Sequence, residues 1–431
     1  MNRSLVIEAV ALYWPMALCA VLYLWQRVSN RNIKRTLTAA MMASAWVAAT
    51  LPWLNDLCVS AGFWSFHVEH GYALENLPLG LYVGWILLWG VVPALLLKWM
   101  KAQWIILAML LLDILTMSLF DPVMKLTSGV WLWGEVLLVG VSLVPAAYLA
   151  KWVIREERVG WRAGLISTAF VMLILVVIPT SAEAVRVDLL GSWLSYSLVG
   201  KCLWLTLLLL VSMPGIAGVM EFSKVGNGTP IPYDAPRKLV TTGVYSYVQN
   251  PMQLSMVLVL LVWGWMLGSW FVVGLALLAV VYSAGLARWS EGADLEQRFG
   301  EKWVDYDKQI SAWKFRLTPV WVIPKNGENA RIYIDADCVV CQPLAVWIQK
   351  RRVISLDVCR ASDWSGKPLK RITYLDPNTG ETREGILAMG KVFQHIHLGW
   401  AWLGWVLSLP GVGWIIQRAI DAGGGGEQTR K

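Results

Sequence analysis

Seven stretches of this chain are apolar over a length that can cross a lipid bilayer. They lie near residues 5–26, 37–54, 80–97, 103–119, 129–150, 163–183 and 197–219. A membrane-spanning helix needs about 17–25 predominantly apolar residues, because every backbone polar group in lipid must be paired within the segment. The sequence therefore predicts an all-α polytopic membrane protein.

A further apolar stretch at 252–287 is too long for a single span. Gly264 and the group Leu267-Gly268-Ser269 interrupt its middle, which favours a tight helical hairpin and raises the expected total to roughly nine transmembrane segments. Composition agrees, because only 15% of the residues are charged, whereas a soluble chain carries about 25%. The 28 Trp residues are typical of side chains that anchor at membrane interfaces.

Basic residues gather in alternate loops, after the first, third, fifth and seventh apolar segments, and the loops between them are mostly acidic. Because basic loops remain in the cytoplasm, we expect the N-terminus outside and everything after about residue 288 in the cytoplasm. The expected location is the inner or plasma membrane. The basic loops also account for the net charge of +8. The sequence contains no basic run with interleaved aromatic residues, so it gives no indication of nucleic-acid binding.

The segment 241–255 lies where one apolar segment has ended and the next begins. Gly243 permits a backbone conformation that a side chain would forbid. The rings of Tyr245 and Tyr247 can lie over a ligand or anchor at the interface. At 250–251, Asn suits a helix N-cap and Pro the first turn, where free N–H groups favour an anion. The alternative is a capped helix start with no further role.

A second group of polar residues follows some 40 residues later, at 288–306. It contains Arg288, Glu291, a Phe-Gly pair at 299–300, and Tyr306. The return of the hairpin would bring Glu291 back towards Asn250, where a carboxylate can pair with an ammonium group or fix a polar ligand. The alternative is a solvated glutamate just beyond the membrane.

Together the two groups resemble the isoprenylcysteine carboxyl methyltransferase and phospholipid methyltransferase superfamily. Its members carry Gly-x-Tyr-x-Tyr-x-Arg-(His/Asn)-Pro-x-Tyr-x-Gly, a helical hairpin, a Glu-Glu pair and an ending Phe-Gly-x-x-(Tyr/Trp)-x-x-Tyr. The resemblance covers about 235–318 and implies S-adenosylmethionine at the cytoplasmic face, with a lipid-like acceptor entering from the membrane. It implies Glu291 and Arg288 as catalytic residues. The implied cofactor-binding residues are Gly243, Tyr245, Tyr247, Asn250, Pro251, Leu254, Glu291 and Tyr306.

The chain departs from the family pattern at several positions. Gln249 replaces the Arg before Asn-Pro, Gln253 the following Tyr, Ser255 the last Gly, and Gly292 the second Glu. Losing an Arg and a Glu removes two charged partners for a zwitterionic cofactor, each worth roughly 1.5–3 kcal/mol. A descendant that no longer transfers methyl groups therefore stays an alternative.

A third motif, Asp335-Ala-Asp337-Cys338-Val-Val-Cys341, joins an expected strand at Arg331–Asp335 to an expected helix at Pro343–Arg352. A helix N-terminus favours the thiolate of the first cysteine, and the spacing permits a disulfide. Asp335, Cys338 and Cys341 resemble the start of the DCC family of thiol–disulfide oxidoreductase-like domains, which implies a thioredoxin-like fold and catalytic cysteines. The rival interpretations are an inert docking domain and a zinc site completed by Cys359, His395 and His397.

Four regions follow from these patterns: helices around a substrate chamber at 1–220, the methyltransferase-like part at 221–324, an α/β thioredoxin-like cytoplasmic domain at 330–421, and a disordered tail at 422–431. Within the third region we expect hairpin strands at Ile372–Leu375 and Glu384–Met389. The predicted function is S-adenosylmethionine-dependent methylation of an apolar, lipid-like or thiol-bearing acceptor, with an appended dithiol domain that meets a cytoplasmic redox partner. The alternative is a membrane-anchored thiol–disulfide oxidoreductase with a degenerate methyltransferase-like part.

Other polar residues are better explained without a cofactor. Asp113 and Glu135 lie within apolar segments, where acids are candidates for function, but we expect them to hydrogen-bond between helices. The group His67-Val-Glu-His70 has too few ligands for a metal and suits a solvated loop.

Overall fold

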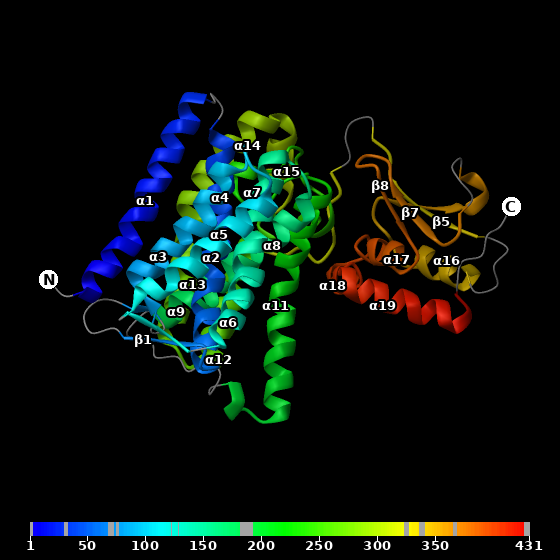
Figure 1. The fold of residues 1–431 in the computed structure, drawn as a ribbon. Helices are drawn as coiled ribbons and strands as arrows, with labels where there is room; N and C mark the ends of the chain where they lie inside the picture. Colours follow the sequence, from blue (N-terminus) through cyan, green and yellow to red (C-terminus); the bar gives the residue numbers. More distant parts are fainter. Residues whose placement is uncertain are drawn as a thin grey trace. The chain divides into compact units, whose positions relative to one another are not determined.

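The computed structural model describes residues 3–29, 33–67, 73–74, 77–121, 123–127, 129–181, 193–322, 327–335, 341–364 and 369–425 (Figure 1). These form two compact units. The first comprises Met1–Leu194 with Gly228–Ala235, and the second comprises Ser195–Asn227 with Pro236–Lys431.

The first unit is a helical bundle with two small antiparallel β pairings. Its helices are α1 (Arg3–Ser29), α2 (Lys34–Ser60), α3 (Leu79–Ile86), α4 (Val92–Leu96), α5 (Ala102–Thr116), α6 (Trp131–Leu138), α7 (Val144–Arg155), α8 (Val159–Met172) and α9 (Ile178–Ser181). Its strands are β1 (Trp64–Phe66), which pairs with β4 (Met124–Leu126), and β2 (Ala73–Leu74), which pairs with β3 (Leu77–Pro78). The α2 helix packs against α3, α4, α6, α7 and α8. Its buried alanines, including Ala39, Ala43 and Ala49, permit this close approach.

Prolines explain the irregular turns inside these helices. The π turns Leu87–Val91, Val139–Leu143 and Leu173–Val177 each end two residues before a proline. Proline lacks an N–H and leaves the carbonyl four residues earlier without its helical donor. At two prolines, one after a π turn and one inside α2, a side chain from another helix supplies the missing donor. Trp46 Nε1 donates to the Val141 carbonyl at 3.0 Å, upstream of Pro145, and the Tyr82 hydroxyl donates to Ala48 at 2.7 Å, upstream of Pro52.

Seven helical segments in the described part of the chain are long and apolar enough to cross a membrane. They are Arg3–Val28, Lys34–Ser60, Leu79–Leu96, Ala102–Phe120, Trp131–Arg155, Val159–Ser181 and Leu198–Lys224. They coincide with the seven apolar segments predicted from the sequence. The two hairpin arms, Pro251–Leu267 and Trp270–Gly285, are shorter apolar helices, so the expected total of about nine stays a prediction.

The second unit begins with α11 (Leu198–Lys224), followed by the hairpin of α12 (Pro251–Leu267) and α13 (Trp270–Tyr282). Gly268, at φ +64°, ends α12, and the Ser269 hydroxyl accepts from Val272 N to begin α13. The predicted hairpin break is therefore confirmed. The chain continues through a π turn at Ser283–Ala287 into α14 (Arg288–Phe299) and α15 (Glu301–Gln309).

A four-stranded mixed sheet follows in the same unit. Its elements are β5 (Ala330–Ile334), α16 (Cys341–Gln349), β6 (Leu356–Arg360), β7 (Thr373–Asp376), β8 (Glu381–Glu384), α17 (Ile386–Phe393), α18 (Leu398–Leu407) and α19 (Pro410–Ile420). The strand order is β6-β5-β7-β8, with β5 parallel to β6 and antiparallel to β7. The α17 helix packs on β7 and β8, and α18 and α19 pack on α17 (Figure 1).

Two local predictions for this region need correction. The hairpin forms, but its second strand is β8 rather than Glu384–Met389. Gly385, at φ +60°, ends the strand, and α17 begins immediately after it. Helical structure also extends through Asp421–Gly425, beyond the residue at which we expected disorder.

Candidate functional site

Gly243, in the first motif, lies against α11. Its φ of +63° lies in the left-handed region, and a Cβ at this position would lie 2.5 Å from Glu221 Oε1. The neighbouring Thr242 hydroxyl donates to Glu221 Oε2 at 3.2 Å. Only glycine fits both the backbone and the space.

Both tyrosines of the first motif are buried rather than at an interface. Tyr247 donates to the Gln394 carbonyl at 3.0 Å and packs edge-on against Trp405, so its hydroxyl is committed to structure. Tyr245 stacks on Phe222, with ring centroids 5.1 Å apart. Its hydroxyl is buried without a hydrogen-bond partner among the described residues. Burial raises the pKa of the Tyr245 hydroxyl well above its usual value, so the group is a neutral phenol.

Asn250 and Pro251 begin α12 as predicted, with Asn250 at the N-cap and Pro251 in the first turn. However, the Asn250 side chain makes no capping hydrogen bond in the described structure, and it is only half-buried. Leu254 is also half-buried and packs on the cluster around Tyr245 and Tyr247. The Asn250 amide is therefore not consumed by the helix that it precedes.

The hairpin brings Glu291 close to the start of α12. The Glu291 residue is exposed, yet its neighbours partly exclude water from the carboxyl and raise its pKa, and a hydrogen bond from Gln253 partly opposes the rise. Gln253 Oε1 is itself buried with no partner within the described ranges. Glu291 also acts electrostatically on the Tyr245 hydroxyl. Tyr245, Gln253 and Glu291 thus converge, with two buried oxygen atoms available to a ligand.

Gln249 has a structural role where the family pattern has arginine. Its Nε2 donates to Asp307 Oδ1 at 2.9 Å and to the Ile310 carbonyl at 2.5 Å. Tyr306 makes a parallel connection, since its hydroxyl donates to the Tyr245 carbonyl at 2.9 Å. These bonds hold the second motif against the first, and Tyr306 supports the site from behind.

The remaining positions of the family pattern are Ser255, Arg288 and Gly292. Ser255 accepts from the Gly215 N–H of α11 at 2.7 Å, so this departure connects two helices. Arg288 is exposed at the start of α14. Gly292 has no atom within 4 Å of the position that a Cβ would take.

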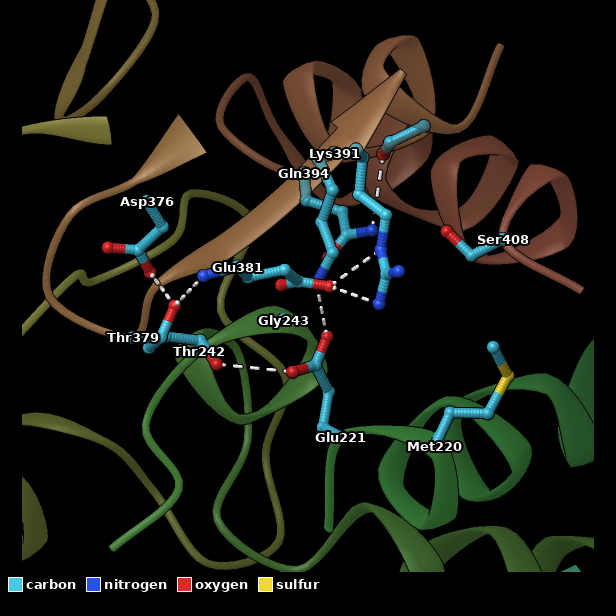
Figure 2. Close-up of polar contacts among 12 residues, drawn as sticks. Met220, Glu221, Thr242, Gly243, Asp376, Thr379, Glu381, Lys391, Gln394 and Ser408 are labelled. Atoms are coloured by element: carbon cyan, nitrogen blue, oxygen red, sulfur yellow. Dashed lines mark hydrogen bonds and ion pairs between the residues drawn. The ribbon is translucent and has the colours of Figure 1, made fainter. Parts of the chain in front are cut away.

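A buried ion network adjoins Gly243 that sequence patterns did not predict (Figure 2). Lys391 Nζ lies 2.6 Å from Glu221 Oε1 and 2.8 Å from Glu381 Oε2, and Arg383 lies 2.8 Å from Glu381 Oε1. Burial alone would lower the pKa of Lys391, but the two carboxylates raise it above its usual value. Burial would raise the pKa of Glu381, yet Lys391 and Arg383 lower it. The network joins α11 to α17 and β8.

The cysteine motif lies mostly outside the described residues. Cys338 falls outside them, and Cys341 is described only as the first residue of α16. Of the other zinc-ligand candidates, His395 engages both ring nitrogens, with Tyr374 Oη at 3.0 Å and the Ile354 carbonyl at 2.7 Å. His397 accepts from Gly399 N to cap α18. Over the described residues, no group of three His, Cys, Asp or Glu side chains is arranged to hold a metal.

Asp113 and Glu135, the two acids within apolar segments, differ in their hydrogen bonding. Trp89 Nε1 donates to Asp113 Oδ2 at 3.0 Å, which confirms the expected hydrogen bond between helices. Glu135 is fully buried near Asp113, but both its oxygens lack a hydrogen-bond partner in the described structure, so that expectation was wrong for Glu135. His67 follows β1, and the rest of its His-Val-Glu-His group lies outside the described residues.

Comparison with known proteins identifies one family. Residues 210–302 match the phospholipid methyltransferase family. The match contains the end of α11, the segment around Gly243, the hairpin and α14. Searches of curated proteins and of solved structures gave no match. With the seven apolar helices, the family match indicates an integral-membrane methyltransferase.

Proposed function

We propose that the chain is an S-adenosylmethionine-dependent membrane methyltransferase whose methyl donor binds beside Tyr245, Gln253 and Glu291. The observation that carries the proposal is the pair of buried, unpartnered oxygens on Tyr245 and Gln253, facing one carboxylate within the segment that matches the family. Buried polar atoms normally find partners, so a polar ligand fits here. Negative and neutral oxygens suit the ammonium and sulfonium charges of that cofactor.

S-adenosylmethionine supplies a methyl group that is already activated by a sulfonium leaving group. The protein's task is then to align the acceptor and exclude water. Glu291 would hold the ammonium group or accept a proton from the acceptor, and Arg288 would orient a polar part of the acceptor. An apolar, lipid-like or thiol-bearing acceptor suits the helices before residue 221, because a lipid-facing bundle presents apolar surface.

Purified full-length protein in lipid nanodiscs should bind methyl-labelled S-adenosylmethionine. Glu291→Gln and Tyr245→Phe should each weaken binding by about tenfold, since one charge-assisted or buried hydrogen bond is lost. Asn250→Ala should also weaken it. Glu296→Gln is the matched control, because Glu296 is a second exposed glutamate on the same helix. Absence of binding, or binding unchanged by Glu291→Gln, overturns the proposal.

A second candidate activity is thiol–disulfide exchange by the C-terminal domain. The supporting observation is that Cys341 begins α16, which connects the parallel strands β5 and β6. The antiparallel strands β7 and β8 complete the sheet and α17 packs on them, an arrangement that supports a thioredoxin-like domain. A redox titration should then show one two-electron couple that Cys338→Ser removes and Cys359→Ser leaves. Methyl-donor binding by the same variants separates the two activities.

We also propose that the N-terminus lies outside and the C-terminal domain in the cytoplasm. The alternating basic and acidic loops support this orientation. Labelling with a membrane-impermeant amine reagent in intact cells should spare Lys308 and react with Lys125. The reverse result reverses the topology.

A further inference from the structure

A cavity of about 520 Å³ lies beside the ion network on a different face of α11 from Tyr245. Gly218 and Phe222 face the tyrosine, whereas Ala217 and Lys224 line the cavity. Its other walls come from β8, α17, α18 and α19. The cavity is therefore separate from the proposed methyl-donor site.

Two buried polar atoms belong to residues that line this cavity and lack partners in the described structure. Gln394 Oε1 is an acceptor and Trp405 Nε1 a donor, on side chains that are 1% and 2% exposed. Native proteins rarely leave such atoms unsatisfied. A donor and an acceptor in one cavity wall suit a ligand that carries a hydrogen-bonding polar group.

Lys224 lines the cavity and has both cations and carboxylates as neighbours. The groups that act on it electrostatically are Arg383, Lys391, Glu221 and Glu381. Lys391 pairs with both carboxylates and Arg383 with Glu381. Within the described ranges, no ion pair involves Lys224, so its ammonium group is the member of this set that lacks a carboxylate partner. An anion in the cavity would pair with it.

Two further charged residues line the cavity. Glu384 is an exposed carboxylate, and Arg371 pairs with Asp421 at 2.9 Å. Other lining residues are apolar, Leu387 and Trp414 among them, and Trp414 is 62% exposed. The site thus combines a cationic end with an apolar surface.

We propose that this cavity is a second ligand site, which binds an amphiphilic anion. Its carboxylate or phosphate lies at Lys224 and Arg383, a polar group bonds to Gln394 and Trp405, and its apolar part packs on Leu387. Such an anion is either a soluble organic acid or the headgroup of a lipid, and the two sources share this chemistry.

Binding of radiolabelled octyl phosphate, butyl phosphate and octanol to full-length protein in zwitterionic nanodiscs tests the proposal, with empty nanodiscs as background. We expect saturable binding of octyl phosphate that Lys224→Met weakens about tenfold and Lys224→Arg retains. Trp405→Phe, which keeps the ring and removes the N–H, should weaken binding severalfold. Lys302→Met is the control for the loss of one positive charge at another exposed position.

Equal binding of butyl and octyl phosphate identifies a soluble anion, and binding of octyl phosphate alone identifies a lipid headgroup. The proposal is overturned if octanol binds as tightly as octyl phosphate, if neither phosphate saturates, or if Lys224→Met changes nothing. S-adenosylmethionine binding by Lys224→Met should equal that of the wild type, which separates failure here from failure of the proposed function.

Discussion

The Tyr306 hydroxyl donates a 2.9 Å hydrogen bond to the backbone carbonyl of Tyr245, across 61 residues of sequence. Tyr245 and Tyr306 are both almost fully buried. This bond connects the two halves of the candidate methyl-donor site through a backbone atom. The position of the Tyr245 ring therefore depends on a helix that follows the whole hairpin.

Tyr306→Phe should destabilise the protein by about 1–3 kcal/mol, because it leaves the buried Tyr245 carbonyl without its donor. The measurement is the thermal midpoint of purified protein in detergent. Tyr282→Phe removes a hydroxyl from a side chain that is 59% exposed and should leave the midpoint unchanged. Equal effects of the two variants would contradict the role assigned to the bond.

Gly243→Ala should be much more damaging than Gly292→Ala. The first change costs roughly 1–2 kcal/mol for left-handed backbone alone, and its methyl group would meet the Glu221 carboxylate. The second places a methyl group in open space on a helix, where alanine is stabilising by roughly 0.5–1 kcal/mol. Thermal midpoints of the two variants should move in opposite directions.

Lys391→Met should cost about 3–5 kcal/mol, since two buried carboxylates lose their shared cation. Adding Glu221→Gln to this variant should recover part of the loss, because one uncompensated charge is removed. Arg418→Met, on the exposed surface of α19, is the control. A double variant no more stable than Lys391→Met would show that the network is not electrostatic in origin.

Acid should destabilise the fold through His395. Burial lowers the pKa of its imidazole to about 3 in the folded protein, while the unfolded value is about 6.5. The unfolded state therefore binds the extra proton, and stability present above pH 6.5 falls by roughly 2 kcal/mol by pH 5. His395→Gln should flatten the dependence of the thermal midpoint on pH between 7 and 5. An unchanged slope would exclude His395 as its source.

Gly292→Glu would restore the second carboxylate of the family pattern. Nothing lies within 4 Å of the Gly292 Cβ position, so the side chain starts in open space. If the methyl donor binds as proposed, its affinity should rise by up to about fivefold, the gain expected of one exposed charge pair. Gly411→Glu, also in open space, should leave that affinity unchanged.

The elements that the sequence predicts well are those with a strong local cause. The spans follow from the length of apolar sequence that lipid requires, and the hairpin break follows from Gly268, whose φ is positive. The strand predicted at Arg331–Asp335 forms as β5, one residue earlier at Ala330–Ile334. The end of β8 was misplaced because Glu384–Met389 is apolar enough for either strand or helix, and only the backbone at Gly385 separates them.

Pairings between distant residues were not readable from the sequence. The return of Glu291 towards the start of α12 followed from the hairpin, which is a local motif, but its contact with Gln253 did not. The ion pair of Glu221 with Lys391 crosses 170 residues and has no spacing rule to reveal it. Gln249 looked like a lost arginine, but its structural bonds to Asp307 and Ile310 became visible only when α15 was placed beside it.

The bond between Lys391 and Glu221 bears on modularity. A chain cut at the end of the methyltransferase-like part would retain Glu221 beside Gly243 and lose the only cation within ion-pair distance of that carboxylate in the described structure. We therefore expect removal of the C-terminal domain to destabilise the segment around Gly243, so the two regions are not independent modules.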